Sequence, residues 1–368
     1  MSLPDVINCW LLTKPGNPRD GTPPEFERGT LPMPEIEEGW GVVQVAGCGV
    51  CHTDISFAYM GVPTVNGPPK GSPLVLGHEV SGTMVAGPED LIGKQVIVPA
   101  VIPCHDCVAC NRGRENLCVN MQMPGNSMGQ YGGFADYMPV PVHDLCVIDD
   151  CNGIPLEHLA VVADAVTTPY QAAIQADVMP GDGVIVTGHA GGIGKHMVQI
   201  CKALGANHVI GFDPSERRDE MKEFGLSHAI DSTMEGGFKA VKGAFKAYCK
   251  EHGLNPYWGW KIFECSGTAA GQSLAFGLLP KGGTLMIVGF TPDKVEVRLS
   301  NLMVFGAKVE GVWGCNPVHY PKALKRVLDG YVKISPLVQT HPVSQFLEAL
   351  EEAHESPPWQ RIVLTPDW

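Results

Sequence analysis

Four cysteines within one short stretch constrain the fold of this chain more than any other feature of its 368 residues. They follow the pattern C-x2-C-x2-C-x7-C and are Cys104, Cys107, Cys110 and Cys118. Four thiolates this close in sequence can all reach one tetrahedral Zn²⁺ ion, as in structural zinc sites. The alternatives are free thiols or a set of disulfides, and disulfides are typical of short secreted proteins. The spacing therefore predicts a structural zinc lobe at about residues 100–122.

The composition argues against several classes of protein. The net charge is −13, from 26 basic and 39 acidic residues, whereas proteins that bind nucleic acid or anionic membranes need a basic surface. No apolar run approaches the roughly 20 residues of a membrane-spanning helix, and the first residues lack the pattern of a secretion signal. Thirteen cysteines without such a signal indicate a reducing compartment. We therefore expect a cytoplasmic protein that binds neither nucleic acid nor membrane.

Strand and helix patterns predict two domains and a returning segment. Residues 1–155 contain short apolar stretches punctuated by glycine and proline, which is typical of a β-rich domain. A helical pattern over 155–176 spans the start of the second domain, residues 156–305, which then alternates between buried strands, such as 183–187, and helices. This alternation predicts a doubly wound parallel sheet. We expect residues 306–368 to pack back on the first domain.

A glycine-rich loop, G-H-A-G-G-I-G, connects a buried strand with a helical stretch at 195–204. Its glycines allow a tight turn and a close approach of backbone N–H groups to a pyrophosphate, and they are Gly188, Gly191, Gly192 and Gly194. The next strand, 209–212, ends in Asp213, about 20 residues further on, where an acid binds a ribose diol. Because Asp213 would repel a 2′-phosphate, the sequence favours NAD over NADP, although Arg217 and Arg218 follow closely. A βα turn with a purely structural role is the alternative.

A second candidate metal site involves residues that are far apart in the sequence. Cys51 lies in G-C-G-V-C-H-T-D, and His78 lies downstream in G-H-E. One thiolate and one imidazole supply half of a zinc site, and a catalytic zinc ion needs a third protein ligand and an open position. The spacing does not identify that third ligand. It also leaves open that Cys51 is a buried apolar residue and that His78 is an ordinary loop residue.

Together, these motifs resemble those of the zinc-dependent medium-chain alcohol dehydrogenases. The residues G-V-C-H-T-D at 49–54, G-H-E at 77–79, the four-cysteine lobe and the late glycine loop occur in the order of that family, over nearly the whole chain. The resemblance implies an α/β protein with a GroES-like catalytic domain and a Rossmann domain that binds NAD. It also implies two Zn²⁺ ions per chain, one catalytic and one structural, and a homo-oligomer, either a dimer or a tetramer.

The resemblance further implies which residues bind the catalytic zinc ion. Cys51 and His78 are two of the ligands. Asp164 takes the place of the cysteine that relatives often carry six residues before a tyrosine, here Tyr170. A carboxylate binds zinc well and, being a harder donor than a thiolate, leaves the ion a modestly stronger Lewis acid. Glu79 follows His78 directly and is a candidate fourth ligand.

The same resemblance assigns roles to residues around the ion. Thr53 resembles the hydroxyl that begins the family's proton relay, but Ser56 stands where many relatives carry a histidine. Asp54 resembles the acid that orients the ligand imidazole. His52 is expected to face the cofactor pyrophosphate, and Arg361 to contact Asp54 and a cofactor phosphate.

The implied reaction is oxidation of a secondary ring alcohol to a ketone, with hydride transfer to NAD. Long stretches, among them 96–104, 161–170 and 298–303, resemble family members that act on a cyclic hydroxy-acyl-CoA. The alternatives are another cyclic or allylic alcohol, zinc-dependent addition of water to an activated enoyl- or enone-CoA, and a nucleotide-binding protein without activity. The glycine loop and Asp213 favour the redox reaction, because hydration needs no nicotinamide cofactor.

The remaining polar residues suggest no further site. His105 lies inside the cysteine lobe, where four thiolates already complete a tetrahedron, and His143, His319 and His341 are typical of loops. The segment 59–72 is a candidate lining of the substrate entrance, or else an ordinary surface loop.

Overall fold

The computed structural model describes residues 3–61 and 72–368, so most of the segment 59–72 lies outside the described residues. The chain divides into two compact units. Unit 1 comprises Met1–Thr167, Gly314–Leu328 and Ile334–Trp368, and unit 2 comprises Thr168–Trp313 and Asp329–Lys333. The division after Thr167 lies later than the boundary expected near residue 155, and the return to unit 1 at Gly314 lies later than the one expected at 306.

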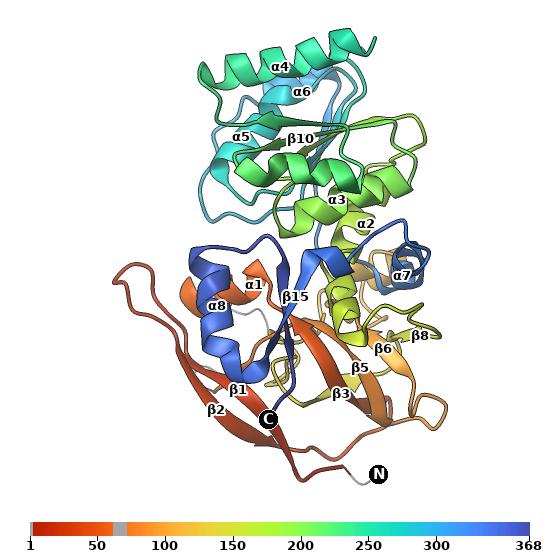
Figure 1. Ribbon diagram of the computed structural model, residues 1–368. Coiled ribbons are helices and arrows are strands. Elements are labelled where there is room, and N and C mark those ends of the chain that lie inside the picture. Colours follow the sequence, from red (N-terminus) through yellow and green to blue (C-terminus); the bar gives the residue numbers. More distant parts are fainter. Residues whose placement is uncertain (1–2, 62–71) are drawn as a thin grey trace. The chain divides into compact units, whose positions relative to one another are not determined.

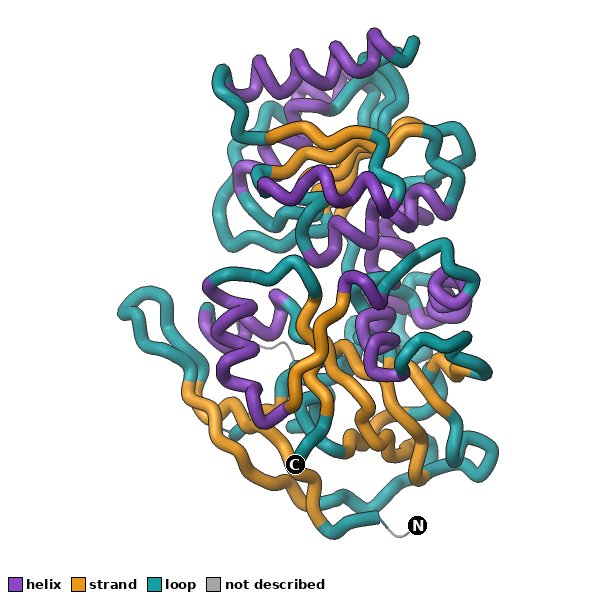
Figure 2. The backbone as a smooth tube through the Cα atoms, viewed as in Figure 1, coloured by secondary structure: helices purple, strands orange, loops and turns teal. Residues whose placement is uncertain are grey.

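Unit 1 is built largely from short strands (Figures 1 and 2). The strands are β1 (Val6–Lys14), β2 (Glu25–Pro32), β3 (Trp40–Gly49), β4 (Leu74–Val75), β5 (Glu79–Ala86), β6 (Gln95–Val98), β7 (Tyr137–Pro141), β8 (Cys146–Ile148), β15 (Val338–Pro342) and β16 (Arg361–Thr365). One sheet has the order β15-β16-β3-β5-β6-β8, with β7 paired to β3, and a smaller sheet has the order β2-β1-β4. All of these pairs are antiparallel except β15 with β16.

Short helical elements pack against these sheets. The helical elements of unit 1 are α1 (His52–Tyr59), η1 (Cys110–Arg112), η2 (Glu115–Leu117), η3 (Leu156–Ala163), η5 (Pro317–His319), α7 (Tyr320–Leu328), η6 (Ser335–Leu337), η7 (Val343–Gln345) and α8 (Phe346–Glu355). Of these, η3 contacts β3, β5 and β6. Phe346 at the start of α8 stacks on Trp10, with ring centroids 4.9 Å apart, and meets Phe134 edge-on at 5.2 Å. Residues near the C-terminus thus complete the core of unit 1.

Unit 2 confirms the predicted Rossmann sheet. Its elements are α2 (Thr167–Gln175), β9 (Gly183–Thr187), α3 (Gly192–Ala203), β10 (His208–Asp213), η4 (Glu216–Phe224), β11 (His228–Asp231), α4 (Gly237–Glu251), β12 (Lys261–Glu264), α5 (Ala269–Leu278), β13 (Thr284–Ile287), α6 (Ser300–Phe305) and β14 (Lys308–Gly311). The strands are all parallel, in the order β11-β10-β9-β12-β13-β14. Helices α3 and α4 lie on opposite faces of the sheet (Figure 1). The strand order reverses between β9 and β12, which is where dinucleotides bind in such sheets.

The helical stretch predicted over 155–176 forms as two separate helices, η3 and α2. Pro169 explains the interruption, because in a continuous helix its ring would clash with the carbonyl four residues earlier. The Ala163 carbonyl accepts hydrogen bonds from Thr167 Oγ1 (3.0 Å) and from the Tyr320 hydroxyl (2.5 Å). The break leaves Asp164 in a non-helical conformation, with φ −139°.

Among the residues that the structure describes, no helix combines the length and the apolar character needed to span a membrane.

Candidate metal and cofactor sites

The residues predicted to bind the catalytic zinc ion converge within unit 1. Cys51 is the N-cap of α1, His78 immediately precedes β5, and Asp164 lies at the break between η3 and α2. Asp164 Oδ2 lies 3.9 Å from Cys51 Sγ and 3.6 Å from His78 Nε2. With Glu79 included, ligand atoms from all four residues lie within 4.8 Å of one another. Ligands bound to one tetrahedral zinc ion are separated by about 3.5 Å, so this spacing suits a shared ion.

Asp54 fixes the orientation of Cys51 and His78 through its two carboxylate oxygens. One carboxylate oxygen, Oδ2, accepts a hydrogen bond from the backbone N–H of Cys51 (3.0 Å). The other, Oδ1, accepts one from Gly77 N–H (3.0 Å) and lies 3.3 Å from His78 Nδ1. Since Nδ1 of the ring is held by Asp54, Nε2 is the nitrogen that faces the cluster. This is the arrangement by which a carboxylate orients a metal-binding imidazole.

The surroundings of His78 Nε2 indicate whether these residues fit a zinc ion. The His78 side chain is 2% exposed, and Nε2 has no hydrogen-bond partner among the described residues. A buried polar atom left this way costs about 1–3 kcal/mol, and the 3.6 Å to Asp164 is too long for a hydrogen bond. Burial lowers the pKa of this ring, but neighbouring groups, chiefly Asp54, raise it well above the ordinary value overall. A cation held by thiolate, imidazole and carboxylate fits these requirements.

Glu79 pairs with Arg361 in the interior of unit 1. The Nε and Nη2 atoms of Arg361 donate to the two carboxylate oxygens at 2.7 and 2.5 Å. Burial raises the pKa of Glu79 to about 7, although the charge of Arg361 opposes this shift. The prediction that Arg361 contacts Asp54 is therefore wrong, since its guanidinium is bound by Glu79. A metal ion that took Glu79 as a ligand would have to compete with Arg361 for the carboxylate.

Strand order and one glycine explain this pairing. Strands β16 and β5 flank β3, and Gly49 at the end of β3 pairs with Val363 on one side and with Glu79 on the other. A Cβ atom at Gly49 would lie 2.2 Å from Glu79 Oε2. The Glu79 carboxylate can therefore lie over β3 and reach Arg361, the first residue of β16, because position 49 carries no side chain.

The hydroxyls on α1 differ in their surroundings. Thr53 Oγ1 lies 3.7 Å from Cys51 Sγ, at the edge of the cluster. Ser56 Oγ donates to the backbone carbonyl of His52 at 2.9 Å, and Ser56 is buried. Ser56 therefore does not substitute for the relay histidine of relatives, whereas Thr53 is close enough to the cluster to begin a relay. His52 itself is exposed.

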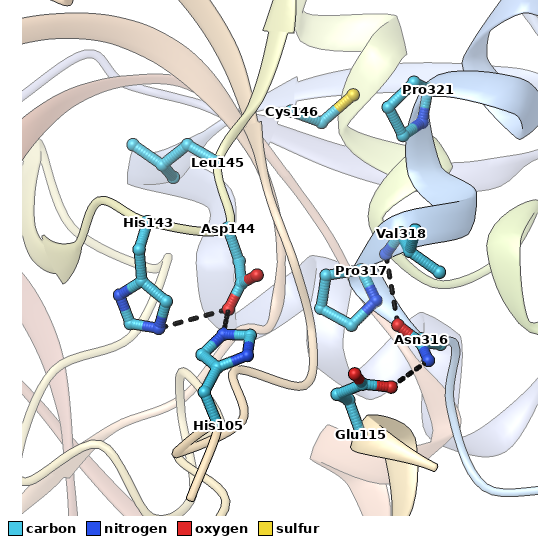
Figure 3. Close-up of a pocket in the computed structure, with 10 residues that line it drawn as sticks. All are labelled: His105, Glu115, His143, Asp144, Leu145, Cys146, Asn316, Pro317, Val318 and Pro321. Carbon is cyan, nitrogen blue, oxygen red and sulfur yellow. Dashed lines mark hydrogen bonds and ion pairs between the residues drawn. The ribbon is translucent and has the colours of Figure 1, made fainter. Parts of the chain in front are cut away.

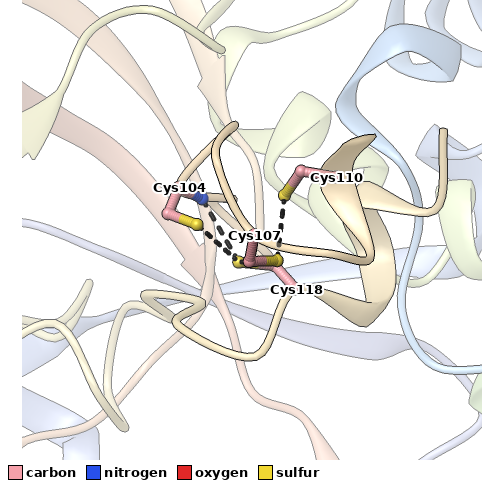
Figure 4. A group of neighbouring side chains, drawn as sticks. All are labelled: Cys104, Cys107, Cys110 and Cys118. Atoms are coloured by element: carbon pink, nitrogen blue, oxygen red, sulfur yellow. Dashed lines mark hydrogen bonds between the residues drawn. The ribbon is translucent and has the colours of Figure 1, made fainter. Parts of the chain in front are cut away.

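The four cysteines of the lobe also converge (Figure 4). Cys107 Sγ lies 3.5 Å from Cys110 Sγ and 3.8 Å from Cys118 Sγ, which in turn lies 3.4 Å from Cys104 Sγ. A tetrahedral zinc ion separates its thiolates by about 3.8 Å, whereas a disulfide joins sulfurs at about 2.05 Å. All thirteen cysteines of the chain are free thiols. Backbone N–H groups, foremost that of Cys110, lower the pKa of Cys107 to about 6, which favours the thiolate that a metal binds.

The glycine loop of unit 2 has the geometry expected of a dinucleotide-binding turn. Gly188 has φ +74°, and a Cβ there would lie 2.5 Å from backbone atoms of Ser266. A Cβ at Gly194 would lie 2.0 Å from the Gly188 carbonyl oxygen, so α3 packs directly against the turn. Gly191 and Gly192 are exposed at the N-terminus of α3. The first and last glycines thus shape the turn, and the middle two leave its backbone accessible.

Asp213 links the end of β10 to this loop. Its Oδ2 accepts a hydrogen bond from Ala190 N–H, and its Oδ1 accepts one from Ser215 N–H, both at 2.9 Å. The carboxylate lies beside the glycine loop, where a ribose diol would have to reach it.

The two arginines that follow Asp213 have partners of their own. Arg217 binds Glu220 through Nε at 2.5 Å and Nη2 at 2.7 Å. Arg218 Nη2 lies 3.7 Å from Asp231 Oδ2. Neither of these contacts directs an arginine toward Asp213. The two arginines therefore give little support to a binding site for the 2′-phosphate of NADP.

Tyr320, to which the sequence assigned no role, positions the segment that carries Asp164. Its fully buried hydroxyl accepts a hydrogen bond from Ala100 N–H (3.0 Å) and donates to the carbonyl of Ala163. No local pattern could reveal this role, because Tyr320 is 157 residues away from Ala163 in the chain. The structure also brings together His105, His143 and Asp144, for which the sequence suggested no site.

Comparison with known proteins identifies the family. The chain matches the family described as alcohol dehydrogenase GroES-like domain over residues 37–150, and the family described as zinc-binding dehydrogenase over residues 192–329. The chain belongs to the zinc-dependent medium-chain alcohol dehydrogenases. It is therefore an oxidoreductase that acts on alcohols and uses zinc together with NAD or NADP.

Individual relatives of this alcohol dehydrogenase differ in substrate. An alcohol dehydrogenase from Geobacillus stearothermophilus is 29% identical over 339 residues, covering 90% of this chain and 93% of the relative. Scyllo-inosose 3-dehydrogenase from Thermotoga maritima is 32% identical over 242 residues, covering 59% and 60%. Their names indicate different alcohols, so the family alone does not define the substrate.

Solved structures show that both forms of the cofactor occur on this fold. Acetophenone reductase from Geotrichum candidum, in complex with NAD, is 25% identical with a TM-score of 0.81, and the match covers 99% of this chain and 98% of that one. A putative zinc-binding dehydrogenase from Sinorhizobium meliloti, bound to NADP, is 23% identical with a TM-score of 0.83, covering 99% and 100%.

Proposed function

We propose that this alcohol dehydrogenase oxidises a secondary ring alcohol to a ketone with NAD as the hydride acceptor, and that Cys51, His78 and Asp164 bind its catalytic zinc ion. One observation carries this proposal: a thiolate, an imidazole and a carboxylate meet around the buried, unpartnered Nε2 of His78. When bound, the ion would act as a Lewis acid that lowers the pKa of the substrate hydroxyl, while NAD would accept the hydride.

The surrounding residues of the chain support this chemistry by orientation and charge. Asp54 holds His78 Nδ1, which leaves Nε2 facing Asp164 and available to a metal ion. The Cys51 thiolate and the Asp164 carboxylate would balance the two positive charges of a zinc ion. Glu79 and Arg361 neutralise each other at close range, so they add little net charge beside the cluster.

Thr53 is the residue that we propose to receive the proton of the substrate hydroxyl. Its Oγ1 lies at the edge of the cluster, 3.7 Å from Cys51 Sγ. Because the hydroxyl of Ser56 is buried and bound to a backbone carbonyl, the proton must leave by a route other than the next turn of α1. Cofactor ribose hydroxyls and water are the route that we favour.

Substitution at Thr53 tests this role. Thr53→Ala should lower turnover by about 10²-fold, the lower range for general acid–base groups, and should leave the zinc content unchanged. Ser56→Ala is the matched control on the same helix and should retain nearly full turnover. Wild-type turnover in Thr53→Ala would remove Thr53 from the mechanism.

Residues of unit 2 are the basis of the proposed preference for NAD over NADP. Gly188, Gly191, Gly192 and Gly194 shape the loop that would hold the pyrophosphate. From the family resemblance, His52 and Arg361 are proposed to contact a cofactor phosphate. Asp213 would bind the ribose diol and repel a 2′-phosphate. Since Arg217 and Arg218 are engaged by Glu220 and Asp231, we propose NAD over NADP. A measured preference for NADPH would contradict the role of Asp213.

For the substrate, we propose a cyclic hydroxy-acyl-CoA, specifically 6-hydroxycyclohex-1-ene-1-carbonyl-CoA, converted to 6-oxocyclohex-1-ene-1-carbonyl-CoA in anaerobic benzoyl-CoA degradation. The support is sequence resemblance over long stretches such as 96–104 and 161–170, which goes beyond the motifs shared by the wider family. The product is a conjugated ketone, and this conjugation favours oxidation of the ring alcohol.

The decisive assay follows the absorbance of reduced nicotinamide with the proposed thioester, its free acid, cyclohexanol and a primary alcohol. We expect the thioester to give the highest kcat/KM, with NAD preferred over NADP. A parallel assay without nicotinamide monitors loss of the conjugated enone. If the enone is hydrated and no alcohol reduces NAD, the enzyme adds water and the redox proposal is wrong. If cyclohexanol equals the thioester, only the CoA assignment is wrong.

We also propose a homo-oligomer, either a dimer or a tetramer. β14 is the last strand of the parallel sheet as described, and α6 beside it exposes Met303 (77%) and Val304 (60%). Unpaired strand edges and exposed apolar patches are typical of interfaces between subunits. Sedimentation analysis of Met303→Glu against the wild type tests this: the variant should dissociate, and a monomeric wild-type enzyme would contradict the proposal.

A further inference from the structure

Three side chains outside both proposed zinc sites converge on the surface of unit 1 (Figure 3). His105 Nε2 lies 2.9 Å from Asp144 Oδ2, and His143 Nε2 lies 3.2 Å from the same oxygen. The two imidazole rings meet edge-on, with centroids 4.9 Å apart and an interplanar angle of 72°. Both Nε2 atoms therefore meet at Asp144 Oδ2, and His143 Nε2 also lies 3.4 Å from the backbone carbonyl oxygen of Pro103.

The spacing of these three atoms suits a single metal ion. Adjacent ligands on an octahedral ion with bonds of about 2.1 Å are separated by about 3.0 Å, and the two measured separations are 2.9 and 3.2 Å. Two imidazoles and a carboxylate form a ligand set that divalent first-row transition metals accept. A dication bound here would lie beside Asp144 Oδ2 and would replace the present contacts of the two Nε2 atoms with that oxygen.

The site is accessible from solvent. The side chains of His105 and His143 are 47% and 45% exposed, while that of Asp144 is 12% exposed. All three line a hollow of about 380 Å³ that Glu115 and Asn316 help to line (Figure 3). Three protein ligands leave open coordination positions, which water from this hollow can fill.

The backbone explains why His105 belongs to this cluster and not to the cysteine set. His105 has φ +56°, a left-handed conformation that is uncommon for a residue other than glycine. It lies between Cys104 and Cys107, whose sulfurs converge with the two later cysteines of the lobe. The His105 ring instead meets Asp144, in the turn between β7 and β8.

We infer that His105, His143 and Asp144 form a binding site for a divalent transition-metal ion, separate from the catalytic and structural zinc sites. Bound there, the ion would connect the cysteine lobe, through His105, to the β7–β8 turn, through His143 and Asp144. With only three protein ligands in an exposed position, this site binds metal more weakly than the buried cluster at Cys51.

Zinc titration of the complete enzyme tests this site. Metal content is first measured as isolated, and zinc is then added through a metal buffer over a range of free concentrations. Wild type should bind one equivalent more than His143→Gln above the as-isolated content. The matched control is His341→Gln, which removes a histidine of unit 1 that lies on strand β15 and not in a loop as predicted, and which should bind as wild type does.

A second measurement uses the wild type alone, so that it does not depend on whether the His143→Gln variant folds. Excess zinc should protect His105 and His143 from modification by diethyl pyrocarbonate, and should slow amide hydrogen exchange in residues 104–118. Equal zinc binding by wild type and His143→Gln, or modification of both histidines at the same rate with and without zinc, would overturn the proposal. The three residues would then form an ion pair only. Neither readout depends on catalytic activity, so the outcome is independent of the proposed reaction.

Discussion

The two proposed zinc sites of unit 1 differ in how far apart their ligands lie in the sequence. The four thiols of the lobe come from a single loop, in which Cys104 and Cys118 are 14 positions apart. In the buried cluster, Cys51 and Asp164 are 113 positions apart. Local chain geometry alone could therefore bring the four thiols of the lobe around the proposed metal ion. The buried cluster exists only when the β3–α1 turn, the start of β5 and the η3–α2 break are all in place.

The largest effect is expected from loss of a ligand in the distributed cluster. His78→Ala should lower kcat/KM by about 10³-fold or more, because the Lewis acid supplies several kcal/mol of transition-state stabilisation. Metal analysis should show one zinc ion lost per chain, with the lobe still loaded. His341→Gln serves as the control histidine variant. Full activity in His78→Ala would show that the cluster does not bind the catalytic ion.

Loss of a ligand in the lobe should affect stability instead of chemistry. Cys107→Ser should release the structural ion and lower the thermal midpoint, because metal binding in such sites contributes directly to folding free energy. The kcat of the protein that remains folded should stay near that of the wild type. Cys151→Ser removes a half-buried thiol outside both sites and is the control, because a hydroxyl can also donate to Gln95 Oε1. Equal midpoints for Cys107→Ser and the wild type would contradict a structural metal in the lobe.

A smaller effect is expected from substitution of Asp54, whose carboxylate contacts His78 Nδ1. Asp54→Asn keeps the size of the side chain but weakens the hold on His78 Nδ1 and on two backbone N–H groups. Zinc affinity at the cluster should fall by about 10–100-fold, the usual cost of losing such a partner. Competition with a chelator measures this, and zinc in the lobe is the internal reference. Unchanged affinity at the cluster would show that Asp54 does not orient the ligand.

The smallest effect is expected at Tyr320. Tyr320→Phe removes a hydroxyl that bonds the Ala163 carbonyl and the Ala100 N–H, at a cost of about 1–3 kcal/mol in the free energy of unfolding. Because the segment next to Asp164 loosens, zinc affinity at the cluster should decline while that of the lobe is unchanged. Tyr331→Phe, at an exposed tyrosine of unit 2, is the control. Equal losses at both zinc sites would indicate general destabilisation and not positioning of Asp164.

Much of the architecture could be predicted because its signals are local. The strand at 183–187, the glycine loop and the acid at the end of the next strand follow one another directly, and β9 forms with the predicted bounds. The helical pattern over 155–176 shows the limit of this approach. The apolar periodicity continues through Asp164, but the structure forms two helices, η3 and α2. The ring of Pro169 disfavours a continuous helix, and the Ala163 carbonyl instead accepts hydrogen bonds from the Thr167 and Tyr320 side chains.

Spacing and residue type were enough to predict a four-thiolate lobe and a parallel nucleotide-binding sheet, because both depend on residues that are neighbours along the chain. The partner of Arg361 and the meeting of His105 with His143 depend instead on which strands and loops become neighbours in space. Gly49 illustrates the reason: a missing side chain on β3 admits the Glu79 carboxylate and brings it to Arg361, which lies 282 residues further along the chain. No short-range pattern contains that information, since it arises from sheet order and packing.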